Sequence, residues 1–153
     1  MHALLPDAFH PGESFDRVTL SHVFEHVHDP RKLLANCQRF LRPGGEVWLS
    51  LPNIHGLGHW LYGRNWFALD PPRHLFLPTA AMLKQLLRDA GFVNIQLKRR
   101  GRGAGTTVLP SDRYAEIRGG RRRNTRAWIA LIDIVASLFR GAAEEIVVSA
   151  RKP

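Results

Sequence analysis

The sequence predicts an α/β fold built around a mostly parallel sheet. A strand–helix–strand pattern runs from Phe15 to Asn53, a helix and a strand follow over 78–98, and an apolar run lies at 144–150. Two strands joined by a helix are expected to lie parallel and adjacent, with a right-handed crossover. The length of 153 residues suits one domain with a hydrophobic core, so we treat 1–153 as a single domain.

The first strand–helix–strand unit has clear boundaries. Residues 17–21 form an apolar, β-branched run, and Pro30–Leu41 places its apolar residues on one helical face. Asp29 suits the N-cap, and a proline fits the first turn because its missing N–H would be unpaired there. We expect Pro43-Gly44-Gly45 to close this helix through a left-handed glycine, before a strand resumes over 46–51.

The second half of the chain predicts two further helices and two further strands. A short irregular helix is expected over 55–64, and a longer one from its cap at Thr79 to Gly91. The sheet should gain strands over 92–98 and 144–150.

A basic segment separates these last two strands. The net charge is +9, and Lys98–Arg126 holds ten basic residues against two acidic ones. We expect a basic loop over 101–126, in which Arg118–Arg126 could bind nucleic acid or an anionic membrane, or simply be solvated. Residues 125–139 predict a helix that is apolar around most of its circumference. Such a helix is buried in a core or interface, or lies on a membrane surface.

The cellular environment is indicated by three absences in the sequence. One cysteine cannot form an intramolecular disulfide and fits a reducing compartment. Residues 1–14 show no secretory signal, and the apolar helix is too short to span a bilayer. We therefore expect a cytoplasmic protein, with peripheral membrane contact as an extension. Cys37 lies on the apolar face of its helix, which favours core packing over nucleophilic chemistry.

Three histidines and a glutamate follow the first strand, in the segment His22–His28. They lie at the carboxyl end of that strand, where ligands bind in open α/β sheets. The pattern H-x-x-E-H formally matches an inverted zinc-protease motif, but that motif needs both histidines on one helical face. Because this segment reads as a loop, we expect no metal.

A family resemblance rests on the order of these motifs. FD-x-V-x-x-x-x-V-x-EH-x-x-DP, an amphipathic helix, L-R-P-G-G and a strand ending in P-N resemble the fourth and fifth strands of class I S-adenosylmethionine-dependent methyltransferases. The similarity continues through PRHLFLPTAAMLKQLLRDAGFVNIQLKRR and covers Phe15 to about Arg100; Trp66–Leu75 carries a second local signature, W-x-x-x-D-x-P-R-H-L. The resemblance implies a partial Rossmann-like methyltransferase sheet, with the last strand antiparallel between the second and third.

The resemblance also implies roles for individual residues. S-adenosylmethionine would be the cofactor, and His26, paired with Glu25, would act as general base on an acceptor hydroxyl. Some relatives carry E-x-x-E-H and hold a divalent metal there. His22 replaces their first glutamate, and hard cations prefer oxygen ligands, so magnesium is not expected. The remaining site residues implied are Ser21, His22 and Val23 on the cofactor side, and Asn53, Trp66, Arg73 and His74 on the substrate side.

Two structural alternatives apply to these residues. Glu25 and His26 could cap and orient the loop that follows, and Arg73 could pair with Asp70 to pin its own loop. The acceptor would be a small or lipid-like molecule.

The sequence departs from the family at its amino-terminal end. Family members open with a strand that runs into a G-x-G-x-G-type loop, followed by an acidic residue that binds the ribose. Met1–Ser14 contains one glycine and no such loop. We therefore expect an amino-terminally truncated domain, either a fragment of an enzyme or an inactive interaction module. Its strand 17–21 would form an exposed sheet edge that favours a homodimer.

Overall fold

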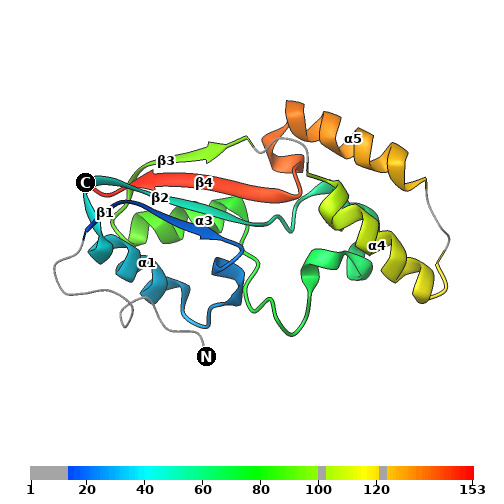
Figure 1. The fold of residues 1–153 in the computed structure, drawn as a ribbon, viewed down its shortest axis with the longest axis horizontal. Helices are drawn as coiled ribbons and strands as arrows, with labels where there is room; N and C mark the ends of the chain where they lie inside the picture. Colours follow the sequence, from blue (N-terminus) through cyan, green and yellow to red (C-terminus); the bar gives the residue numbers. More distant parts are fainter. Residues whose placement is uncertain (1–13, 100–102, 121–123) are drawn as a thin grey trace.

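A four-stranded sheet with the order β1-β2-β4-β3 forms the centre of the protein (Figure 1). The computed structural model describes residues 14–99, 103–120 and 124–153. The strands are β1 (Phe15–Ser21), β2 (Leu41–Pro52), β3 (Val93–Lys98) and β4 (Glu145–Arg151).

The pairing of these strands confirms the predicted topology. β1 and β2 are parallel, with Val18 opposite Val47 and Ser21 opposite Ser50. β4 lies between β2 and β3 and runs antiparallel to both. Within the described residues, β1 forms one edge of the sheet, as expected. The fold is the α/β arrangement predicted from the sequence.

The helices begin where their capping residues predict. The Asp29 carboxylate accepts a hydrogen bond from the backbone N–H of Lys32 at 2.9 Å, and the Thr79 hydroxyl accepts one from Met82 at 3.2 Å. The α-helices are α1 (Pro30–Phe40), α2 (Leu57–Tyr62), α3 (Ala80–Asp89), α4 (Gly105–Ile117) and α5 (Thr125–Leu138). Short 3₁₀ turns are η2 (Phe24–His26), η3 (Gly63–Asn65), η4 (Phe67–Leu69) and η5 (Arg140–Ala142).

The prediction that Pro43-Gly44-Gly45 closes α1 is wrong. The helix ends at Phe40, and the extended residue Leu41 already belongs to β2. Its side chain is 1% exposed, so burial draws the chain into the sheet directly after the helix. Gly44 does adopt a left-handed conformation, with φ 76°, but it does so inside β2, where its N–H donates to the carbonyl of Lys152.

The expected basic loop over 101–126 is also wrong for most of its length, because α4 occupies Gly105–Ile117. Pro110 lies inside this helix, where a proline removes one backbone hydrogen bond. Two features offset that cost: Thr107, Val108 and Ser111 are buried, and Asp133 of α5 accepts hydrogen bonds from the backbone of Gly103 and Ala104 at the start of the helix. Residues 100–102 and 121–123 lie outside the described residues.

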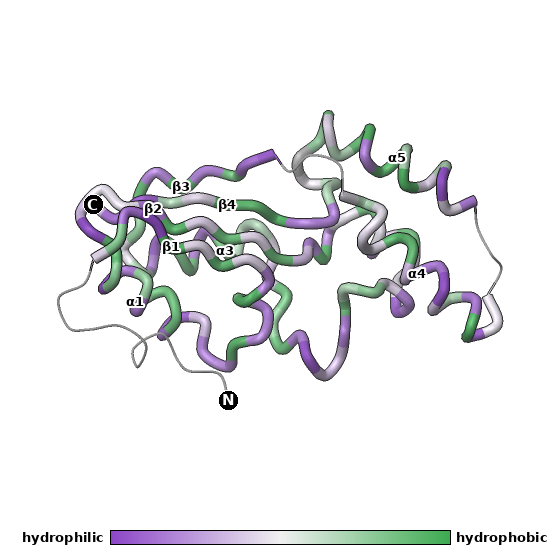
Figure 2. Tube along the Cα trace, in the orientation of Figure 1, coloured by the Kyte–Doolittle hydropathy of each residue, from purple (hydrophilic) through white to green (hydrophobic). Residues whose placement is uncertain are grey.

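Two hydrophobic clusters divide the interior. The first packs α1 and α3 against the sheet, and the apolar middle of β4 contributes to it (Figure 2). The second lies beyond the carboxyl ends of β1 and β2, where α4 and α5 sit together (Figure 1). It contains Tyr62, Trp66, Val108 and Ile132.

Glu144, directly before β4, ties three segments of the second cluster to the sheet. Its carboxylate accepts hydrogen bonds from the Gly58 N–H at 2.6 Å, the Trp66 indole at 2.9 Å and the Thr107 hydroxyl at 2.6 Å. The side chain is buried, so these donors replace water. A Cβ at Gly58 would lie 2.2 Å from the carboxylate, which explains a glycine inside α2.

The apolar helix predicted over 125–139 is confirmed as α5, but only one of its faces is covered. Ile132 and Ala136 are buried, whereas Ile134 and Leu138 are 59% and 65% exposed. None of the helices in the described parts of the chain has both the length and the apolarity needed to cross a membrane.

Replacing Glu144 by alanine should lower the free energy of unfolding by about 3 kcal/mol, because three buried donors lose their acceptor together. Urea unfolding followed by circular dichroism measures the effect. Glu116→Ala, which removes an exposed acid on α4, is the matched control and should change stability by less than about 0.5 kcal/mol. Equal stability of the two variants would contradict the role given to Glu144.

Cys37 should make the protein less stable at high pH. Burial raises the pKa of its thiol from 9.0 to about 12, against a smaller opposing effect of its backbone hydrogen bond. Between these values the unfolded chain loses the thiol proton and the folded chain keeps it. Stability therefore falls as pH rises, by up to about 1.4 kcal/mol per unit. The difference between wild type and Cys37→Ala in urea midpoint, measured from pH 8 to 11, isolates this contribution; parallel profiles would refute it.

Candidate functional site

The candidate site lies at one end of the sheet, where the carboxyl ends of β1 and β2 meet. Because β4 is antiparallel to β2, its first residues reach the same edge. Ser21 and His22 leave β1 there, Asn53 follows β2, and Glu145 opens β4. Ligands of open α/β sheets bind at this end of the parallel strands.

Glu25 is the central side chain of the site and is fully buried within η2. Its backbone carbonyl accepts hydrogen bonds from Leu75 at 2.7 Å and Phe76 at 3.2 Å, which holds the 70–77 loop against η2. Its carboxylate oxygen Oε1 lies 3.2 Å from His22 Nδ1 and 3.9 Å from His74 Nε2. Among the described residues, its other oxygen, Oε2, has no hydrogen-bond partner although it is buried.

His26 and His74 face each other beside Glu25, with ring centroids 4.8 Å apart. His26 Nδ1 lies 2.9 Å from the carbonyl of Arg73, and His74 Nδ1 lies 2.7 Å from the carbonyl of Ala68. A carbonyl only accepts hydrogen bonds, so Nδ1 carries the proton in both rings. In the neutral form, Nε2 then holds the free lone pair on each imidazole.

His22 sits between two carboxylates. Its Nδ1 is 3.2 Å from Glu25, and its Nε2 is 3.4 Å from Glu145. Its backbone is left-handed, with φ 51°, and its N–H donates to Ser50 at 2.9 Å. Glu145 also accepts a hydrogen bond from the Ser50 hydroxyl at 2.5 Å. We missed Glu145 as a site residue; the predicted antiparallel placement of the last strand was the signal that puts its first residue at this edge.

The residues expected on the cofactor side occupy the turn after β1. Ser21 and His22 are exposed, and the Val23 side chain is 40% exposed. They are therefore accessible to a ligand at the sheet edge. Their role in holding a cofactor stays a prediction.

Two of the residues expected on the substrate side lie inside the protein instead. Trp66 is 1% exposed and its indole donates to Glu144, so its position differs from the expected substrate-side one. Asn53 is also buried: its amide donates to the carbonyls of Gly141 and Ala143, and its side-chain oxygen accepts from His55. Trp66 is buried because it belongs to the second hydrophobic cluster. Asn53 is buried because its amide anchors the residues that directly precede β4.

The other two substrate-side residues lie on the loop that covers Glu25. Arg73 is exposed and forms an ion pair with Asp70, the alternative considered for it from the sequence. His74 is half-buried and joins the cluster with Glu25 and His26.

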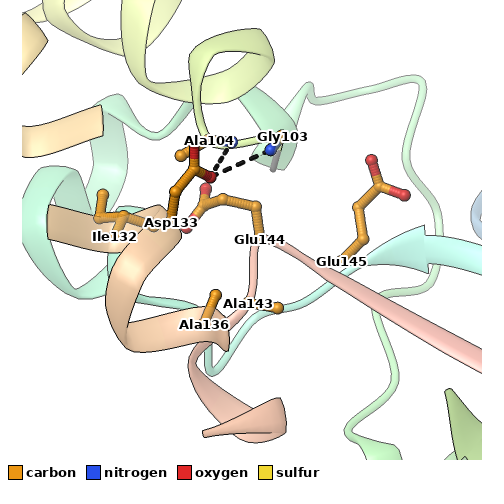
Figure 3. A pocket seen from close by; sticks show the side chains of 8 residues that line it. All are labelled: Gly103, Ala104, Ile132, Asp133, Ala136, Ala143, Glu144 and Glu145. Atoms are coloured by element: carbon orange, nitrogen blue, oxygen red, sulfur yellow. Dashed lines mark hydrogen bonds between the residues drawn. The ribbon is translucent and has the colours of Figure 1, made fainter. Parts of the chain in front are cut away.

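A small hollow lies behind the site, between the starts of α4 and β4 and the middle of α5 (Figure 3). Asp133 spans its rim, accepting from the N–H groups of Gly103 and Ala104 at 3.0 and 3.1 Å. Glu144 and Glu145 both line this hollow, and their side chains diverge from neighbouring positions at the start of β4 (Figure 3). Glu145 also lies 3.4 Å from His22, so the hollow adjoins the candidate site through this residue.

The basic segment Arg118–Arg126 is only partly described. Arg118 donates to the side chain of Asn65 at 2.9 Å, which links the end of α4 to η3. Arg126 is exposed on α5, and Arg121–Arg123 lie outside the described residues. Contact with nucleic acid or membrane through this segment stays a prediction.

Comparison with known proteins gives the same family as the motifs. A family model described as a methyltransferase domain matches residues 4–97. A ubiquinone biosynthesis O-methyltransferase from Thiobacillus denitrificans is 50% identical over 46 residues, which are 30% of this chain and 19% of that protein. The match thus spans less than a fifth of the curated relative.

Solved structures show the same fold. A methyltransferase from Thermotoga maritima, described as a possible histamine N-methyltransferase, aligns with a TM-score of 0.55 at 18% identity, over 92% of this chain and 57% of that one. An S-adenosylmethionine-dependent methyltransferase from Archaeoglobus fulgidus aligns with a TM-score of 0.54 over 92% of this chain and 60% of its own. With the family model matching more than half of its residues, the chain belongs to the methyltransferase domain family, the class I S-adenosylmethionine-dependent methyltransferases.

Proposed function

We propose that this chain forms the carboxyl-terminal part of a methyltransferase that transfers a methyl group from S-adenosylmethionine to a hydroxyl oxygen. The observation that carries the proposal is the cluster of Glu25, His26 and His74 at the carboxyl edge of the parallel strands. The name of the Thiobacillus denitrificans relative, an O-methyltransferase, supports oxygen as the acceptor atom.

The geometry supports His26 as the general base of the proposed reaction. Because its Nδ1–H is held by the Arg73 carbonyl, its Nε2 lone pair is available to a hydroxyl. His26 is exposed, so an acceptor can reach it. The bound cofactor would supply a methyl group activated by a sulfonium. His26 would take the proton of the acceptor hydroxyl, whose oxygen would accept the methyl group in exchange for the carbon–sulfur bond of the cofactor.

The described residues fit one side of the cofactor. The exposed turn of Ser21, His22 and Val23 lies at the end of β1, and the buried carboxylates of Glu25 and Glu145 favour a cation nearby. No Gly-x-Gly-x-Gly loop follows a strand among residues 14–99, 103–120 and 124–153. We therefore propose that the glycine-rich wall and the ribose-binding acid are supplied by another segment or another chain.

The exposed apolar side chains of α4 and α5 support an apolar or lipid-like acceptor. Leu109 and Ile117 of α4 and Ile134 and Leu138 of α5 are more than half exposed. Arg118 directly follows α4 and Arg126 lies on α5, so these helices combine apolar and basic side chains, which supports peripheral contact with an anionic membrane over nucleic acid. A cytoplasmic location agrees with this proposal.

The free edge of β1 is the place where a further strand would pair. Among the described residues only β2 pairs with β1, although parallel strands are normally flanked on both sides. We propose that a second copy of the chain pairs along this edge. An inactive interaction module would use the same edge, and absence of cofactor binding would favour that alternative.

Calorimetric titration with S-adenosylmethionine is the first test of the proposed function. We expect saturable binding in the micromolar to millimolar range. His26→Ala should retain that binding but transfer methyl to a catechol probe about 100-fold more slowly or worse, because the general base is lost. His28→Ala, an exposed histidine two residues away, should behave as wild type. No binding at millimolar cofactor would overturn the proposal for this chain.

Light scattering after size exclusion tests the pairing at β1. We expect a mass of twice 17.3 kDa at micromolar concentration. Thr19→Lys places a charge on the exposed strand and should shift the population toward the monomer, because charged side chains at a sheet edge oppose pairing. A monodisperse wild-type monomer at all concentrations would refute the dimer.

A further inference from the structure

We propose that the outer face of α5 is a docking surface for a membrane whose lipids carry negative charge. Exposed apolar side chains gather on the helices of the second cluster. Among the described residues, the large apolar side chains that are more than half exposed are Trp60, Leu109, Ile117, Ile134, Leu138 and Phe139. All of them lie on α2, α4 or α5 or directly after α5, whereas α1 and α3 pack theirs against the sheet. Apolar side chains that gather on one part of a surface mark a site of interaction.

α5 lies on the outside of the molecule beside α4 and carries two apolar faces (Figure 1). The inner face packs into the second cluster through Ile132, Trp128 and Ile129. The outer face presents four exposed apolar residues, Ala127, Leu131, Ile134 and Leu138. They follow one another at intervals of four, three and four positions. With 3.6 residues per turn they lie within about 60° of arc, so the outer face is a continuous apolar stripe along the helix.

The charged residues of these helices complement an anionic surface. In the described residues of α4 and α5 and beside them, three arginines are exposed, Arg113, Arg118 and Arg126. One acid, Glu116, is exposed against them. The acid of α5, Asp133, is half-buried and accepts hydrogen bonds from backbone N–H groups at the start of α4, so its charge is turned away from the outer stripe.

A membrane surface suits this combination better than a second copy of the chain or a nucleic acid. Two copies that met through this face would bring arginines of like charge together, which opposes association. A nucleic acid would neutralise the arginines but leave the stripe exposed, because protein–nucleic-acid interfaces are polar and positively charged. A helix lying in the plane of a membrane uses both features, since its apolar side chains enter the acyl boundary and its arginines reach the headgroups.

This inference deepens the proposed function and rests on its peripheral membrane contact, for which it names the face. The second cluster lies beyond the carboxyl ends of β1 and β2, the same end of the sheet as the candidate site (Figure 1). Docking through α5 would therefore hold the candidate site near the lipid surface, where a lipid-like acceptor is concentrated. Membrane binding is measured without cofactor or acceptor, so its failure and the failure of methyl transfer are separate results.

Cosedimentation of the whole chain with lipid vesicles tests the face. We expect binding to vesicles that contain phosphatidylglycerol, and binding about 10-fold weaker to pure phosphatidylcholine. Ile134→Lys should weaken binding about 10-fold although it adds a positive charge, because an ammonium group does not enter the acyl region. Met82→Lys is the matched control: it adds the same charge at an exposed apolar position of α3 and should bind as wild type. Arg126→Gln should bind about 5-fold more weakly, because one attraction to the headgroups is lost.

Two further measurements separate membrane insertion from misfolding and self-association. Ile134 is 59% exposed, so Ile134→Lys should match the wild type in its circular dichroism spectrum and in its mass by light scattering. Ile134→Cys carrying an environment-sensitive dye should emit at shorter wavelength on the vesicles, whereas Met82→Cys should not. Cys37 is fully buried and stays unlabelled.

Three results would overturn the proposal. The first is a wild-type chain that does not bind the phosphatidylglycerol vesicles. The second is Ile134→Lys binding as tightly as the wild type, which would indicate attraction through charge alone, as to a nucleic acid. The third is a lower mass for Ile134→Lys than for the wild type, which would assign the outer face of α5 to a second copy of the chain.

Discussion

The buried carboxylate of Glu144 is the interaction on which the arrangement of the second cluster depends. It bonds at once to α2, to the indole of Trp66 and to α4, three segments spread over 50 residues of chain. Each of these donors would otherwise be buried without an acceptor, so none can leave without a penalty. Because Glu144 immediately precedes β4, these hydrogen bonds fix the position of the second cluster relative to β4, an inner strand of the sheet.

The position of the candidate site follows from that connection. Trp66 precedes η4, and η4 leads into the loop that carries Arg73 and His74. With Trp66 fixed by Glu144, the loop returns across the sheet edge and bonds the backbone of Glu25. Two anchors therefore position the histidine cluster. The Glu144 carboxylate holds Trp66, and the backbone carbonyl of Glu25 holds the 70–77 loop.

Much of the fold could be predicted from local sequence, and the failures have a common cause. The caps Asp29 and Thr79 and the apolar periodicity marked α1, α3 and the strands, because these signals act within one turn or one strand. α4 was missed, since its stability comes from Asp133 and from buried contacts with distant residues rather than from propensity. Trp66 shows the same limit for the site: an aromatic residue in a loop looks accessible until its partner, 78 residues away, is known.

The distribution of charge explains why a cation, rather than an anion, suits this edge of a basic protein. The chain carries a net charge of +9, yet Glu25, Glu144 and Glu145 are all buried around the ends of β1 and β2. Glu144 is satisfied by neutral donors, whereas Glu25 and Glu145 turn toward histidines that are half-buried or exposed. Buried carboxylates stabilise positive charge beside them. A sulfonium and an imidazolium are both cations, so the same two carboxylates favour each of them at this end of the sheet.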